Sequence, residues 1–310
     1  MGLFSFLNAR KRDGKGVQKG EDVRPTLKNF FKQFWRKLSH LLSLNILMLF
    51  QVLPVVVGVL AFFFTQKTPS QTSAIFAPLY GASLIEPNAT SALILALEAL
   101  PLSIPVFQPA AYWIIAACAL FLVLTIGWQS VGGFYVLRGL VRGDAVFVFS
   151  DYFHAIKRNF KQGLLFGLLD SFLIIISTFD ILYYSQSVGS FWKDVVFWMV
   201  AAVSLLYWFM RPYIYLMLIT FDMKIKKMFK NALIFSVLGI KRNLLGALGI
   251  VLLVALHLAF IIATPISFVV PVILPIVYIF AAIGFITTYA AYPIIDRYMI
   301  APYQSNSEEQ

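Results

Sequence analysis

Residues 243–295 read NLLGALGIVLLVALHLAFIIATPISFVVPVILPIVYIFAAIGFITTYAAYPII, a run of 53 residues without one Asp, Glu, Lys or Arg. A helix crosses the apolar core of a bilayer, about 30 Å thick, in about 20 residues, so this run is too long for one crossing. Three prolines lie near its middle, where a helix tends to break: Pro265, Pro271 and Pro275. The run therefore predicts two transmembrane helices, over 244–267 and 273–294.

Four further apolar runs are long enough to cross a bilayer, and they cover 41–64, 112–137, 163–184 and 195–220. The sequence thus predicts an all-α, polytopic membrane protein with a six-helix membrane domain over 26–300. Residues 65–111 form a long outer segment between the first two spans. Residues 1–25 form a basic cytoplasmic tail, and residues 301–310 form a short disordered one.

Composition excludes several classes of protein. The chain is 60% apolar and 13% charged, whereas soluble domains are about 45–50% apolar and about 25% charged. This excludes a soluble enzyme, a disordered chain and a small secreted scaffold. Cys118 is the single cysteine, and the three histidines lie far apart, so we expect no disulfide, metal site or cofactor. The common nucleotide-binding and hydrolase motifs are missing from the sequence, and we expect no enzymatic activity.

The basic residues lie mainly on one side of the predicted spans. Of the 25 Lys and Arg residues, 22 lie at one set of span ends, in 1–40, 138–162 and 222–242 and at Arg297. The opposite side has Lys67 and Lys193. The positive-inside rule therefore predicts a multi-pass membrane protein with both termini in the cytoplasm. Cations beside spans meet anionic lipid headgroups, so we expect the net charge of +11 to reflect a lipid partner and not nucleic acid.

Three cytoplasmic segments have apolar residues at helical spacing beside basic ones. The clearest stripe, near the N-terminus, comprises Leu27, Phe30, Phe31, Phe34, Trp35 and Leu38. Basic amphipathic helices of this kind lie in the membrane interface, although docking onto a cytoplasmic partner is an alternative. The predicted membrane-interface residues are Lys28, Lys32, Arg36, Lys157, Arg158, Lys161, Lys227 and Lys230. Each helix precedes a pair of spans, which indicates either a threefold repeat or a composition that interfaces select.

Three ionisable residues interrupt the predicted spans, and these are the candidate binding residues. Asp170 and Arg211 lie at similar depths in consecutive, antiparallel spans, so they can meet. Such residues usually face the bundle interior. They would form either a structural ion pair or a substrate or proton site, unless a span boundary is misplaced. Asp180 lies ten residues beyond Asp170, and it is either a solvated residue near the outer surface or part of one broad face with Asp170.

Two stretches, GGFYVLRGLVRG at 132–143 and DYFHAIKRNFKQ at 151–162, resemble the YesL-like family of bacterial integral membrane proteins (domain of unknown function 624, DUF624). Asn45 and NALI at 231–234 resemble it as well. The chain departs from the family pattern at Gly133–Phe134, where a proline and small residues are common. The resemblance implies a cell-membrane protein associated with carbohydrate utilisation, and it implies no catalytic residues.

The leading hypothesis is a non-enzymatic accessory or regulatory component linked to transport, in contact with transporter subunits and with carbohydrate uptake as one setting. The basic cytoplasmic face and the few polar residues inside the spans motivate it. One rival is a small-solute transporter that uses Asp170 and Arg211 within the bundle. Another is a protein that handles lipids or maintains the cell envelope, suggested by the interfacial helices and the outer segment.

Overall fold

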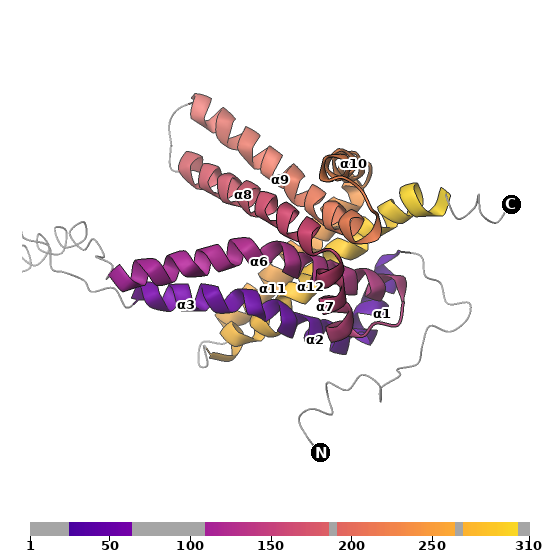
Figure 1. Cartoon of the computed structure of the whole chain (residues 1–310), viewed down its shortest axis with the longest axis horizontal. Coiled ribbons are helices and arrows are strands. Elements are labelled where there is room, and N and C mark those ends of the chain that lie inside the picture. Colours follow the sequence, from indigo (N-terminus) through magenta and orange to yellow (C-terminus); the bar gives the residue numbers. More distant parts are fainter. Residues whose placement is uncertain (1–24, 64–108, 186–190, 264–268, 303–310) are drawn as a thin grey trace, which may run out of the picture. The chain divides into compact units, whose positions relative to one another are not determined.

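The computed structural model contains only helices as regular elements in the part of the chain that it describes (Figure 1), namely 25–63, 109–185, 191–263 and 269–302. Six stretches are long and apolar enough to cross a membrane: Leu38–Gly58, Tyr112–Arg142, Phe160–Ser185, Phe191–Thr220, Ile240–Ala263 and Ile276–Ile300. The predicted all-α fold with six spans is therefore confirmed for these residues. The predicted outer segment and both predicted tails lie almost wholly outside them.

The long apolar run divides into two helices as predicted. α11 (Ile240–Ala263) and α12 (Val269–Ile295) flank residues 264–268, which lie outside the described residues together with Pro265. α12 begins four residues earlier than the predicted span. Pro271 lies in its first turn, where backbone amides have no carbonyl partner within the helix, so a proline there breaks no helical hydrogen bond. A single turn of π-helix, η4 (Asp296–Ile300), follows α12.

The first predicted span, 41–64, is not one continuous helix. α2 (Leu38–Met48) leads into a 3-10 turn, η3 (Leu49–Gln51), and α3 (Val52–Phe63) follows. Pro54 accounts for the interruption, because proline cannot donate a hydrogen bond to the carbonyl of Phe50 and its ring crowds that group. The chain also divides near this point into two compact units, residues 52–122 and the remainder. The contacts described below lie within the larger unit.

The remaining spans are α6 (Pro109–Arg142), α8 (Phe160–Ser185) and α9 (Phe191–Thr220). Each is longer than the apolar run that predicted it, because helical structure continues into the charged ends. The three predicted basic helices are also present, as α1 (Leu27–Arg36), α7 (Val148–Arg158) and α10 (Ile225–Leu238). Their position relative to a membrane stays a prediction.

A single residue joins each basic helix to the span that follows. These residues are Lys37, Asn159 and Gly239, whose φ and ψ angles are −100° and 10°, −109° and 24°, and −90° and 12°. Buried positions recur at the same distance from this junction: Val148, Tyr152 and Ala155 on α7 match Met228, Ala232 and Phe235 on α10. The junction geometry is common to all three helices and the register is common to α7 and α10, which supports a repeat over similar composition alone.

Each basic helix packs on the second span of another repeat. On α7, Tyr152 fills the space beside Gly132 of α6. Phe235 of α10 lies 6.2 Å from Tyr213 of α9, between ring centroids. The ring of Phe30 on α1 lies 5.2 Å from that of Tyr289 on α12.

The second spans also meet one another, since Phe134 of α6 stacks on Tyr215 of α9 at 5.5 Å and α12 packs against α9. Within the larger unit, these contacts therefore link residues of all three proposed repeats.

Single polar residues link the spans inside this unit. The side-chain amide of Asn45 on α2 donates to the carbonyl of Ile276 at 2.6 Å and accepts from the amide of Ala281 at 3.0 Å. Gln129 on α6 donates to the carbonyl of Met48 at 2.6 Å. In contrast, many large apolar side chains point outward, among them Val203, Leu256 and Ile262 with 66%, 70% and 80% exposure. Exposed apolar surface on this scale marks contact with a membrane or another protein.

Candidate functional site

Asp170 and Arg211 meet in the larger unit, between two spans that lie side by side (Figure 1). The Asp170 side chain, on α8, is fully buried. The Nε atom of Arg211, on α9, lies 2.8 Å from both carboxylate oxygens of Asp170. This is the ion pair that the sequence offered as one alternative. A role for the pair in binding a ligand stays a prediction.

Two tyrosines complete the site, and the sequence analysis did not single them out. Tyr207 donates its hydroxyl hydrogen to Oδ1 of Asp170 at 2.7 Å, and Tyr215 donates to Oδ2 at 2.6 Å. Tyr207, Arg211 and Tyr215 are spaced four residues apart, so they share one face of α9. This spacing is present in the sequence, and a search for polar side chains four residues from Arg211 would have identified both tyrosines. We call Asp170 with these three residues the polar cluster.

The polar cluster balances a buried charge with complementary groups. Asp170 has one cation and two hydroxyl groups on its two oxygens, which offsets the cost of burying a carboxylate. The ring of Tyr215 lies 5.5 Å from the guanidinium carbon of Arg211, and Phe166 packs on that ring at 4.8 Å. The arrangement holds α8 against α9. The Arg211 side chain keeps 25% of its surface exposed.

Asp180 does not join the polar cluster. It lies ten residues further along α8, a rise of about 15 Å, and its side chain is half-buried. Asp170 forms its contacts with α9, and Asp180 takes part in none of them. Among the described residues, no contact therefore supports the hypothesis that Asp180 shares a functional face with Asp170.

Most of the predicted membrane-interface cations are exposed. Lys28 and Lys32 on α1, and Lys227 and Lys230 on α10, are exposed, whereas Arg36 is half-buried. The apolar stripe of α1 divides into two: Phe30 and Phe34 pack against the core, but Phe31 and Trp35 are 58% and 68% exposed. Part of the apolar stripe of α1 therefore packs inside the protein, and only the remaining part is exposed to a membrane or a partner.

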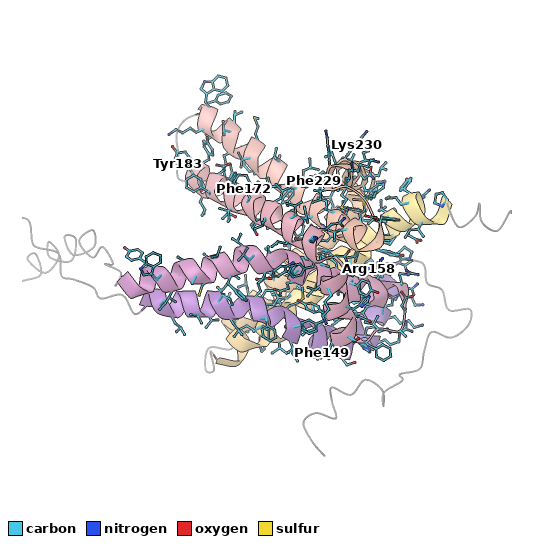
Figure 2. The ribbon with its side chains drawn as sticks, viewed as in Figure 1. Phe149, Arg158, Phe172, Tyr183, Phe229 and Lys230 are labelled. Atoms are coloured by element: carbon cyan, nitrogen blue, oxygen red, sulfur yellow. The ribbon has the colours of Figure 1, made fainter. Side chains whose placement is uncertain are left out.

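The cations at the junction of α7 and α8 line a pocket. Its volume is about 530 Å³, and its walls are residues 157–162 and residues 218–222 at the end of α9. Lys157, Arg158 and Lys161 are exposed on the first wall. Figure 2 labels Arg158 at the end of α7 and Phe172 further along α8. We call this hollow the basic pocket.

These features define an integral membrane protein with a multi-pass, all-helical fold. Residues 109–181 match the family described as protein of unknown function, DUF624. The match covers α6, α7 and most of α8, and it ends at Ile181. It includes Asp170 and one wall of the basic pocket, but it does not include Arg211. It supports the family resemblance seen in the sequence. No curated protein and no solved structure matches the chain.

Proposed function

We propose that this protein is a non-enzymatic accessory or regulatory component beside a transporter in the cell membrane, with both termini in the cytoplasm. The excess of Lys and Arg at one set of span ends supports the orientation. The family resemblance favours carbohydrate uptake as the setting. Under this proposal, α1, α7 and α10 form the cytoplasmic face that a transporter subunit contacts.

The observation that carries this proposal is that the carboxylate of Asp170 is fully engaged by the other members of the polar cluster. Both oxygens of Asp170 already accept hydrogen bonds from Tyr207, Arg211 and Tyr215. A carboxylate engaged in this way is poorly placed to bind a solute or pass a proton. Groups available for recognition are more plentiful on the basic helices, where Lys227 and Lys230 are exposed.

Crosslinking in native membranes, purification in mild detergent and mass spectrometry test this proposal. We expect a transporter subunit at near-stoichiometric amount. Charge reversal on α10 (Lys227→Glu with Lys230→Glu) should lower its yield, whereas Lys193→Glu, on the opposite side, should leave it unchanged. Absence of a transporter subunit at stoichiometric amount, or equal loss in the two variants, contradicts the proposal.

The partial exposure of Arg211 favours a second candidate, a small-solute transporter with its site at the polar cluster. Helices interrupted or bent at mid-membrane often form such sites, and Pro212 follows Arg211 directly. The double variant Asp170→Asn with Arg211→Gln separates the two candidates, because it removes both charges together. If the protein is a transporter, cells with the double variant should resemble cells that lack the gene, although the protein is equally abundant. If it is an accessory subunit, cells with the double variant should resemble cells with the native chain.

A further inference from the structure

We propose that the basic pocket binds the phosphate-bearing headgroup of an anionic phospholipid from the cytoplasmic leaflet. This inference requires the membrane orientation proposed above but not the accessory function. It assigns Lys157, Arg158 and Lys161 to one bound lipid and not only to general attraction by the membrane surface.

Unpaired positive charge is the first observation that supports the site. Three cations line the pocket, and among the described residues none of their side chains forms an ion pair or hydrogen bond. Asp222, on the opposite wall, is a carboxylate in the lining, so the wall charges sum to three minus one, or plus two. Behind that wall, Arg138 donates to the hydroxyl of Thr220 at 2.7 Å. A phosphodiester is the anion that such a set of donors suits.

The position of the pocket is the second observation. It lies where α8 begins and α9 ends, at the cation-rich ends of two spans, which is the level of lipid headgroups under the proposed orientation. The indole of Trp128 stacks on Phe160 at 4.5 Å and donates to its carbonyl at 3.0 Å. Aromatic residues of this kind anchor proteins at the membrane interface. The backbone between the two cationic helix ends is thereby held in place.

A lipid-facing path continues from the pocket along α8, and this distinguishes a lipid from free phosphate. At helical spacing from Lys161, the outward side chains are Leu165, Leu168, Phe172 and Phe179, which are 62%, 38%, 59% and 66% exposed. Figure 2 labels Phe172 on this helix. A headgroup held by Lys161 would place its acyl chains against these side chains, whereas free phosphate has no use for them.

The test compares lipid binding by the full chain in mild detergent, followed by native mass spectrometry. The probes are phosphatidylglycerol, phosphatidylcholine and inorganic phosphate. The pocket variant is Lys157→Gln with Arg158→Gln and Lys161→Gln. The matched control is Lys226→Gln with Lys227→Gln and Lys230→Gln, which removes the same charge from exposed positions of α10 that do not line the pocket. A third variant, Lys157→Arg with Lys161→Arg, keeps the charge.

We expect the pocket variant to bind phosphatidylglycerol on the order of 100-fold more weakly, since each cation near a headgroup contributes about fivefold. The control should weaken binding by less than about threefold, because it removes only screened, distant charge. The arginine variant should bind as the native chain does. Thermal unfolding of each variant without added lipid checks that these exposed substitutions preserve the fold.

Three outcomes would overturn the proposal. Equal weakening in the pocket variant and the α10 control would mean general electrostatic attraction. Equal binding of phosphatidylcholine would mean that the cations do not select the headgroup. Inorganic phosphate that binds as tightly as phosphatidylglycerol, and displaces it, would mean a site for a soluble anion. These outcomes do not depend on whether a transporter subunit is found.

Discussion

At the residue scale, the structure explains why two opposite charges occur within apolar spans. Removal of one partner from a buried ion pair leaves a charge without compensation, which typically costs about 3–5 kcal/mol. Hydropathy placed Asp170 and Arg211 at similar depths but could not say that they touch, because the rotation of each helix about its axis decides that. The tyrosines escaped notice because each looks like an ordinary apolar residue of a span.

Asp170→Asn and Arg211→Gln should each lower the free energy of unfolding by about 3–5 kcal/mol. The double variant should lose less than the sum of the two, because neither charge then remains unpaired. Reversible unfolding in detergent micelles measures all three values as a double-mutant cycle. Additive losses would show that the two side chains are not coupled.

Tyr215→Phe should lower the free energy of unfolding by about 1.5–3 kcal/mol, the usual range for a hydrogen bond to a charged group. The substitution deletes the hydroxyl that contacts Asp170 at 2.6 Å and leaves the ring contacts intact. Tyr184→Phe is the control, since Tyr184 makes a ring contact with Tyr183 but no hydroxyl contact within the described residues. The same unfolding measurement applies, and equal effects of the two substitutions would contradict the account.

At the element scale, hydropathy and charge predicted the helices well, because a span and an amphipathic helix each have a distinct pattern. The pattern missed the turn at Leu49–Gln51, where a proline in an apolar run acts through its backbone and not through its polarity. It also missed how closely α6 and α8 approach. The backbones of Gly127 and Gly167 meet, so that a Cβ atom on Gly127 would lie 2.6 Å from Cα of Gly167.

Gly127→Ala should therefore force α6 and α8 apart, at a cost of about 1–3 kcal/mol, as overpacking usually does. Gly249→Ala is the matched control, because the nearest atom to its Cβ is a methyl carbon of Ile286 at 3.7 Å. Thermal unfolding and size-exclusion profiles in detergent compare the two variants. Equal behaviour would mean that the close contact between α6 and α8 does not form.

At the scale of the whole molecule, the predicted number of spans is confirmed for the described residues, but the threefold repeat was only one of two interpretations of the sequence. Lys37, Asn159 and Gly239 share a backbone conformation although they share no side-chain chemistry. Contacts such as Phe30 with Tyr289 join residues more than 250 positions apart, and no local pattern encodes them. The orientation in the membrane remains a prediction from charge alone.

Cysteine accessibility in intact cells tests the central claim, a six-span protein with its basic helices in the cytoplasm. On a Cys118→Ser background, single cysteines replace Lys28 on α1, His154 on α7, Lys226 on α10 and Lys193 at the opposite end of α9, all exposed positions. With a membrane-impermeant thiol reagent, we expect only the Lys193→Cys protein to be labelled, and the other three to react after permeabilisation. Labelling of any of those three in intact cells, or protection of Lys193→Cys, would contradict the account.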